Sequence, residues 1–418
     1  MFLYGILFVF LIFAQFFEEN MPGLNYWDEI ITILILLVGI FKCLIKKRIE
    51  VNIIKLWIPI KCFVALGLFG NILHPGIQYN NSIIFRDILA SIKFLIVVYA
   101  LRLIKIDSNR QKRITRLAAN ISKLIIVVTF VIAVITYPMN TYFYTGEIRL
   151  VKCFRFVFGH PTFFVSSYVI LTGILIADNN KKNRVFIIFN CILLFLAQRD
   201  KGYIAILMAL VIVFLGETKC TRYLDRIVKS SPKSIWRFRS IFIVIAMGII
   251  AFLIGKEKIF LYFQWGMSAA RPALYVVGVR IAFDYFPFGS GFGTFASTLS
   301  VRNYSNIYDI YNISKVLGLS REYSAFVGDV FWPYVYGQFG MVGFLLYLKM
   351  IYDIIKYQLT RALKSSERLA LIFLWVYIIV ASTAEAFFTN STGIEVATIM
   401  GIFIGYNYER KEDYDRDR

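Results

Sequence analysis

Three groups of cationic side chains interrupt a sequence that otherwise consists largely of apolar runs. The first group is Arg149, Lys152 and Arg155, which precede His160 and Pro161 at the start of an apolar run. Spacings of three would place these cations on one side of a short helix or turn. Arginine offers planar, bidentate donors to phosphate oxygens, so this group is either a phosphate clamp or an interfacial anchor for lipid headgroups. His160 has no partner motif, and we expect it to cap or pack rather than bind a metal or act as a base.

The second group is a very short turn, Gln198 to Gly202, between two apolar runs. Arg199 and Asp200 can simply pair with each other there. Because the turn is too short to leave a membrane surface, the alternative is that Arg199 points into headgroups or into a cavity of the protein. Lys201 adds a second cation to the same turn.

The third group combines arginine with tyrosine and a glycine-rich turn. Arg271, Tyr275 and Arg280 precede Gly289-Ser-Gly291-Phe-Gly293. This turn is not a dinucleotide loop, because no βαβ pattern surrounds it and the full G-x-G-x-x-G is missing. A glycine-rich turn between aromatic residues can bring backbone amides close to an anion or a sugar.

Acidic residues near these groups could move a proton. Asp329 could accept a proton from an acceptor hydroxyl or orient that hydroxyl, and it could equally cap a helix. Arg86 and Asp87 lie at the end of an apolar run, where charged residues tend to face a cavity. The two histidines and five cysteines show no metal-ligand spacing, so we expect no metal site.

The composition indicates the elements that must hold these residues. Of the 418 residues, 59% are apolar and 17% are charged, against about 45–50% and about 25% in soluble globular chains. This pattern predicts an all-α polytopic membrane protein and excludes a cytosolic enzyme, a secreted disulfide scaffold and a disordered chain. We expect about twelve transmembrane helices. The apolar runs are 2–17, 27–45, 56–73, 83–104, 121–137, 163–177, 185–197, 203–216, 240–255, 331–352, 369–383 and 393–408.

These runs divide the chain into four parts: nine spans in 1–255, a large external loop bearing short helices in 256–330, three spans in 331–408, and a charged cytoplasmic tail in 409–418. With twelve spans, the Lys- and Arg-rich short loops all fall on one face, so both termini are expected to be cytoplasmic. The net charge of +20 then reflects topology and attraction to anionic lipids rather than nucleic-acid binding.

The ordered set of motifs resembles the O-antigen ligase and polysaccharide polymerase family of the bacterial inner membrane. The set runs from Arg155 and Gly-His-Pro-Thr through Gln-Arg-Asp-Lys-Gly and Arg-Pro-x-x-Tyr to Gly-Gln-Phe-Gly-Met-Val-Gly, within about residues 149–345. The resemblance implies a metal-independent GT-C-type glycosyltransferase without a cofactor. It would use undecaprenyl-diphosphate-linked oligosaccharide as donor and acceptor, with membrane lipids, a chain-length regulator and a flippase as partners and no nucleic acid.

The resemblance also implies site residues. Arg155, Arg199 and either Arg271 or Arg280 match the family's essential arginines, and Asp329 joins them as a catalytic candidate. The substrate-binding candidates are Arg86, Asp87, Arg149, Lys152, His160, Lys201, Tyr275 and Gly291. The ligase branch carries a histidine in the large loop, and residues 256–331 contain none, which favours a polymerase over a ligase. A multispan transporter or flippase of lipid-linked glycans is the other alternative, although it should place its key charges at the bilayer midplane.

Overall fold

The computed structural model describes residues 1–45, 51–137, 142–215, 260–262, 264–362 and 364–405. The predicted span 240–255 and the tail 409–418 lie outside the described residues. In the described residues, helices form at every predicted apolar run. The helices of the first half are α1 (Phe2–Ile12), α2 (Ala14–Asn20), α3 (Trp27–Ile45), α4 (Val51–Leu73), α5 (Asn81–Leu103), α6 (Ser108–Thr136), α7 (Pro161–Asp178), α8 (Asn183–Leu196) and α9 (Asp200–Leu215). Those of the second half are α12 (Ala270–Asp284), α13 (Thr298–Arg302), α14 (Ile307–Ile310), α15 (Trp332–Arg361), α16 (Ser365–Ala381) and α17 (Ser391–Ile399).

Three of these helices, α6, α7 and α15, are each long and apolar enough to cross a membrane. Helices α1 and α2 make a fourth candidate if they count as one span, but they are bent by 65°. The predicted run 2–17 therefore forms two helices with a bend at Phe13, which leaves the helical conformation (φ −104°, ψ 15°). Other apolar helices, such as α8, are shorter than a straight span requires.

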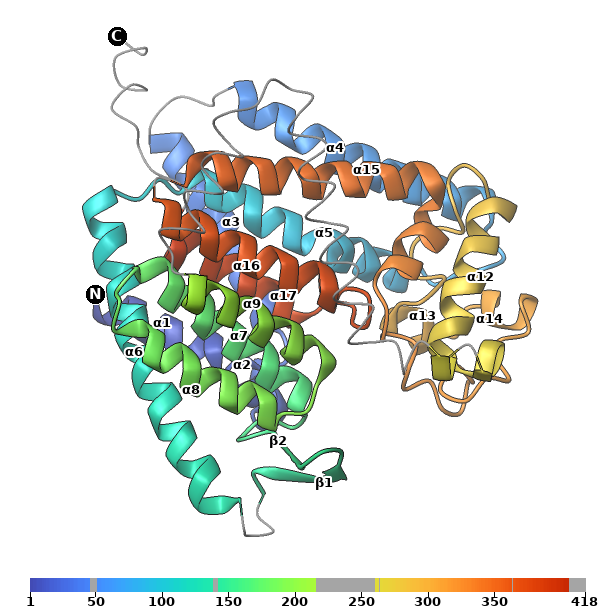
Figure 1. Ribbon diagram of the computed structural model, residues 1–418. Helices are drawn as coiled ribbons and strands as arrows, with labels where there is room; N and C mark the ends of the chain where they lie inside the picture. The colour runs from blue at the N-terminus through green and yellow to red at the C-terminus, as the bar shows by residue number, and fades with distance from the viewer. Residues whose placement is uncertain (46–50, 138–141, 216–259, 263, 363, 406–418) are drawn as a thin grey trace.

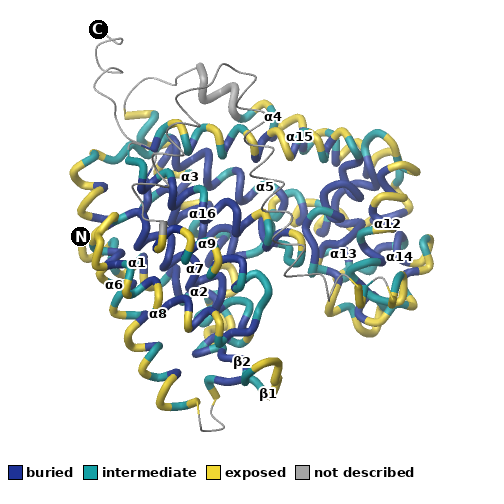
Figure 2. The backbone as a smooth tube through the Cα atoms, viewed as in Figure 1, coloured by how far each residue is buried: buried dark blue, intermediate teal, exposed yellow. Residues whose placement is uncertain are grey.

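The centre of the molecule is a helical bundle around α7, α16 and α17 (Figures 1 and 2). All nine residues of α17 are buried, and α7 is buried along nearly its whole length. Peripheral helices turn apolar side chains outward instead: α3 exposes Leu34, Leu37 and Phe41. Such outward apolar faces are expected where the solvent is lipid, since a water-soluble surface rarely carries large contiguous apolar patches.

The segment between α9 and α15 contains short helices, as the sequence predicts. Helices α12, α13 and α14 lie at the side of the bundle, and α12 packs against α15. A left-handed residue, Gly340 (φ 63°), breaks α15. A Cβ there would lie 2.3 Å from the carbonyl oxygen of Pro287, so only glycine permits this approach of the glycine-rich turn.

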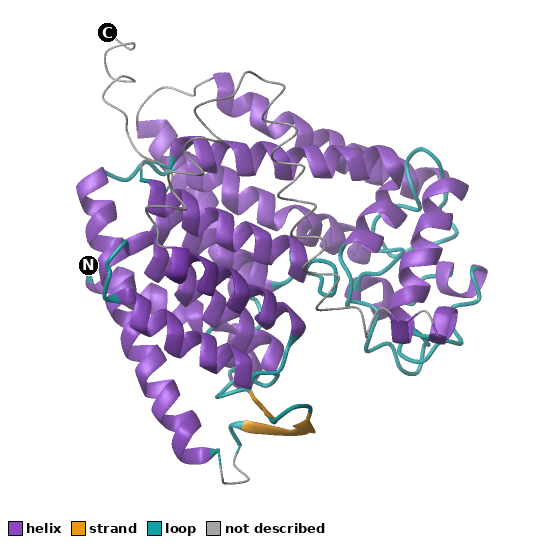
Figure 3. Cartoon of the chain, viewed as in Figure 1, coloured by secondary structure: helices purple, strands orange, loops and turns teal. Residues whose placement is uncertain are grey.

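The cations of the first group do not lie on a helix. Residues Tyr144–Ile148 (β1) and Lys152–Phe154 (β2) form an antiparallel hairpin at the edge of the bundle (Figure 3). Arg149 lies in its turn, and Lys152 begins its second strand, opposite Ile148. The predicted single side shared by Arg149, Lys152 and Arg155 is therefore wrong: Arg149 in the turn bonds to Glu147 and Gln198, whereas Arg155, just after β2, bonds to Tyr142 and Gly159.

Candidate functional site

A carboxylate on the hairpin joins the first and second cationic groups. Glu147 accepts hydrogen bonds from Arg149 Nε (2.8 Å, at Oε1) and from Arg199 Nη2 (2.8 Å, at Oε2). Arg149 also donates to the carbonyl oxygen of Gln198 at 3.0 Å, which ties the hairpin turn to the turn before α9. Partial burial opposes ionisation of Glu147, but Arg149 and Arg199 outweigh it and lower its pKa. The carboxylate therefore stays charged and fixes both guanidinium groups.

His160 lies beside Arg199. As the residue that caps α7, it accepts the backbone N–H of Thr162 at Nδ1 (3.2 Å), as expected from the sequence. Its Nε2 lies 3.5 Å from Arg199 Nη2. Burial lowers the pKa of His160 to about 4, with further lowering by the charges of Arg199 and Lys201. Because Nδ1 accepts, the neutral ring carries its proton on Nε2, where it can donate to an anion.

Arg199 keeps a donor for such an anion. Its side chain is 13% exposed, and its Nε is buried without a hydrogen-bond partner among the described residues. An orphaned guanidinium N–H is costly in a folded protein. Arg199 Nε and His160 Nε2 are thus two neighbouring donors that a bound anion would satisfy.

Lys201 pairs with Glu385, a residue that the sequence analysis did not identify as a candidate. Its ammonium group pairs with Glu385, lies 3.1 Å from Ser166 Oγ and lies over the ring of Tyr377. Glu385 lies in the loop between α16 and α17. Burial raises its pKa, while Lys201 and Arg271 act in the opposite direction. The signal that could have identified Glu385 is that it is the single charged residue in 382–394.

A second ion pair, half-buried, adjoins Glu385. Arg271 on α12 donates from Nη2 to Asp329 at 3.1 Å and from Nη1 to the hydroxyl of Tyr262 at 3.1 Å. Burial raises the pKa of Asp329, and Arg271 partly offsets this. Both Arg271 and Asp329 act electrostatically on Glu385. Tyr275 anchors α12 to the same loop, because its hydroxyl donates to the carbonyl oxygen of Thr383 at 2.8 Å.

These residues are linked by hydrogen bonds and ion pairs and, between Glu385 and the pair of Arg271 and Asp329, by charge alone; we call them the charge cluster. It comes from five segments far apart in sequence: the hairpin, the start of α7, the start of α9, α12 with the loop before α15, and the loop before α17. Its members are Glu147, Arg149, His160, Arg199, Lys201, Arg271, Asp329 and Glu385.

Two of the predicted arginines point elsewhere. Arg155 donates to the carbonyl oxygens of Tyr142 and Gly159, both at 3.0 Å, and lies over the ring of Tyr142. It therefore holds the loop that leads to His160. Arg280 is exposed on α12, nine residues from Arg271, or about 13 Å along the helix axis. Of the two alternatives, Arg271 belongs to the charge cluster.

The glycine-rich turn does not present its amides to a ligand. Residues 289–295 are buried, and the amides of Gly291 and Gly293 donate to Gln338 and Asp87. Asp87 also accepts from the Ser297 hydroxyl at 2.6 Å. The expectation that Gly291 approaches an anion is wrong, since its amide is used inside the protein, and Asp87 is likewise a structural acceptor. Arg86 is exposed beside it, and Lys152 is half-buried on β2.

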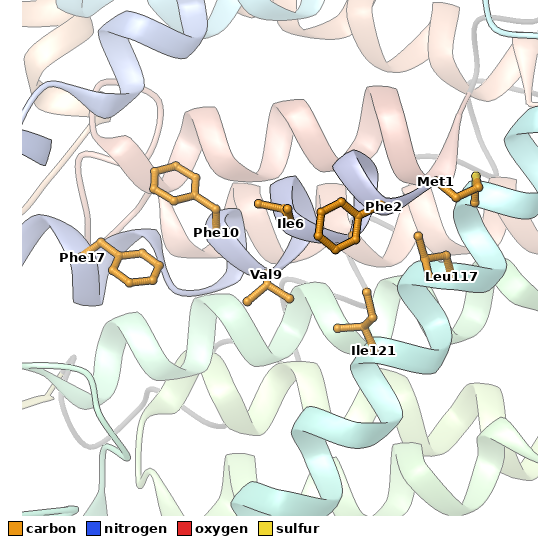
Figure 4. A pocket seen from close by; sticks show the side chains of 9 residues that line it. Met1, Phe2, Ile6, Val9, Phe10, Phe17, Leu117 and Ile121 are labelled. Atoms are coloured by element: carbon orange, nitrogen blue, oxygen red, sulfur yellow. The ribbon is translucent and has the colours of Figure 1, made fainter.

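An apolar groove of about 570 Å³ runs along α1 and α2 against α6 (Figure 4). It is lined by Met1, Phe2, Gly5, Ile6, Val9, Phe10, Phe17, Leu117 and Ile121. The end of the groove at Phe17 is two residues from Glu19, which accepts the backbone N–H of Gly159 at 2.7 Å. Gly159 directly precedes His160, so this hydrogen bond joins the segment after Phe17 to the loop that carries His160.

Within the described residues, no group of three or more His, Cys, Asp and Glu side chains is placed to hold a metal ion. A scan of protein-family models gave no match to the chain, and no curated protein matches it.

Proposed function

We propose that this chain is a polysaccharide polymerase that joins undecaprenyl-diphosphate-linked repeat units at the outer face of the bacterial cytoplasmic membrane. The observation that carries the proposal is Arg199, whose Nε is buried without a partner among the described residues and whose Nη2 lies 3.5 Å from His160 Nε2, held next to the carboxylate of Glu147. A diphosphate needs fixed donors of this kind. An interfacial anchor for lipid headgroups would not need a buried donor.

The reaction suits these groups. The hydroxyl oxygen of the acceptor sugar attacks the anomeric carbon of the donor, and the bond from that carbon to the diphosphate oxygen breaks. Negative charge then develops on the leaving undecaprenyl diphosphate, where Arg199 and His160 stabilise it. The hydroxyl proton passes to a carboxylate. Asp329 is our candidate, because its side chain is 36% exposed against 17% for Glu385.

The apolar groove supplies a place for the lipid. Its lining is almost wholly hydrocarbon, and its end at Phe17 leads through Glu19 to the loop that carries His160. A polyprenyl tail in the groove would therefore keep its diphosphate near the charge cluster. Because the bilayer interior is as apolar as the groove, moving the tail into the groove gains little transfer free energy. The benefit of binding is that the diphosphate is held in position.

The proposed topology has about twelve spans, both termini in the cytoplasm and residues 256–330 outside. It rests on the alternation of Lys- and Arg-rich short loops with loops that lack these residues. Reporter fusions after Lys182 and after Asn303 should give cytoplasmic and external signals. The same signal from both fusions would contradict the topology.

A carrier of lipid-linked glycans is the second candidate, favoured by charges within the helices. Lys93 on α5 pairs with Asp28 on α3, and both side chains are largely buried. Such intramembrane charges are common in transport pathways. Purified protein in liposomes with a defined lipid-linked oligosaccharide separates the two. A polymerase yields longer glycans and free undecaprenyl diphosphate, whereas a carrier moves the substrate across the bilayer without forming a glycosidic bond.

A further inference from the structure

The residue before Arg199 combines a strained backbone with a fully buried polar side chain. Gln198 adopts the left-handed conformation (φ 53°) and is 0% exposed. It lies in the short turn between α8 and α9, where glycine would adopt the same conformation at lower cost. Residues held in this way persist where the surrounding structure fixes them, and they are frequent near functional sites. The side chain of Gln198 therefore has a role that glycine could not fill.

That side chain is bonded at both ends of its amide. Its Oε1 accepts the backbone N–H of Leu150 at 3.2 Å, and its Nε2 donates to the carbonyl oxygen of Phe195 at 2.7 Å. The carbonyl oxygen of Gln198 also accepts a hydrogen bond from Arg149 Nη1 at 3.0 Å. Gln198 thus bonds to two consecutive residues of the hairpin turn, one through its backbone and one through its side chain.

The tip of the hairpin gains little from apolar burial. Ile148 is 68% exposed and Leu150 is 76% exposed, so their side chains contribute little to holding the tip against the bundle. Polar bonds hold it instead, namely those to Gln198 and the pair of Glu147 with Arg199. Because Glu147 lies on the same hairpin, Gln198 fixes the position of the carboxylate that orients Arg199.

We propose that Gln198 is a positioning residue, whose buried amide holds the hairpin so that Glu147 keeps Arg199 in place for a diphosphate. The inference rests on the proposed function. Gln198 acts through its neighbour and does not touch the substrate. Its left-handed backbone also sets where α9 begins, because the carbonyl oxygen of the next residue, Arg199, accepts the N–H groups of Gly202 (2.8 Å) and Tyr203 (3.2 Å).

The test compares Gln198→Asn with the unaltered protein in lipid nanodiscs. Asparagine tolerates the left-handed conformation, but it is one methylene shorter, so its amide falls short of Leu150. We expect kcat for polymer formation to fall by about 10²-fold, with KM nearly unchanged, because the lost interaction is one made in the transition state. The matched control is Asn179→Gly, at a left-handed residue (φ 55°) that ends α7. This control should keep kcat.

A merely structural role gives a different result. It would lower Tm or membrane abundance and leave kcat of the folded protein unchanged, and that outcome overturns the inference. If Gln198→Asn fails to fold, Gln198→Gly takes its place, since it relieves the backbone strain and removes the amide.

Inorganic pyrophosphate separates the inference from the proposed function. Pyrophosphate should raise the Tm of the unaltered protein by binding at Arg199, and the rise should be smaller in Gln198→Asn. If the unaltered protein binds pyrophosphate but forms no polymer, the proposed function is wrong, and the two rises in Tm still test the role of Gln198. Equal rises in the two proteins, or no rise in the unaltered protein, would overturn the inference.

Discussion

Glu147 and Arg199 are 52 residues apart in the chain and are joined by a hydrogen bond of 2.8 Å. The carboxylate on the hairpin holds Nη2 of the guanidinium, while Nε remains buried without a partner in the described residues. Arg199 is therefore fixed in position yet retains a donor. A group that binds a developing negative charge needs this combination, because a preorganised donor costs no reorganisation during the reaction.

The first prediction concerns Arg199. Arg199→Lys should lower the rate of polymer formation by about 10²–10³-fold, because an ammonium group cannot pair with Glu147 and present a second fixed donor. The measurement is glycan chain length and yield from purified protein, with membrane abundance as a check on folding. Arg280→Lys is the matched control and should retain activity. Normal polymer from Arg199→Lys would mean that a point charge suffices there, as for a lipid anchor.

The second prediction concerns the pair of Lys201 and Glu385. Glu385→Gln should destabilise the protein by about 3–5 kcal/mol, since it leaves the Lys201 ammonium group buried and uncompensated. The double variant with Lys201→Met should recover much of this loss. Unfolding of these two variants and of Lys201→Met alone in nanodiscs measures the coupling. Additive effects would show that the two charges do not interact.

The third prediction is a pH dependence from His160. Its pKa is lowered from 6.5 to about 4 by burial and by Arg199 and Lys201. Between these values the unfolded chain binds a proton that the folded chain does not, so the free energy of unfolding decreases as pH falls through this window. His160→Asn replaces the capping Nδ1 with a capping oxygen and does not titrate. The variant should show a flatter Tm profile between pH 6.5 and 4, and an unchanged slope would contradict the assignment.

The fourth prediction tests whether the glycine-rich turn has a structural role or binds an anion. Gly291 has φ 93°, and a Cβ there would lie 2.6 Å from the backbone nitrogen of Asn71. Gly291→Ala should therefore reduce folded protein, at a cost of about 1–3 kcal/mol for overpacking plus backbone strain. Membrane abundance and Tm are the measurements. Normal abundance with lost activity would support direct ligand binding by the turn.

The fifth prediction addresses the apolar groove. Val9→Trp would fill part of the groove and should raise KM for the lipid-linked donor, with a smaller effect on kcat. Leu37→Trp places the same side chain on the outward face of α3, and it should leave both constants unchanged. If Val9→Trp leaves KM unchanged, the tail does not lie in this groove.

The sequence alone determined where the helices form. Long apolar runs stabilise helices in lipid because every backbone hydrogen bond closes within the segment, and helices α3, α5, α7, α8 and α9 follow those runs to within a few residues. Helix α6 begins 13 residues before the run at 121–137, and α15 extends nine residues past the run at 331–352. The hairpin at Tyr144 to Phe154 escaped prediction because its strands are short and its cations repeat at intervals of three. That spacing is as compatible with a helix as with the hairpin turn that forms.

The charge cluster was only partly predictable. Arg199, Lys201, Arg271 and Asp329 stand out as polar residues beside apolar runs. Their partners Glu147 and Glu385 do not, since an ion pair between residues 52 or 184 apart depends on which helices pack together. The same packing places Arg271 against Asp329, leaves Arg280 exposed on the same helix, and withdraws Asp87 into the turn that it supports. Hydropathy is a property of each segment and can be read locally, whereas the alignment of charges from five segments follows only from the tertiary structure.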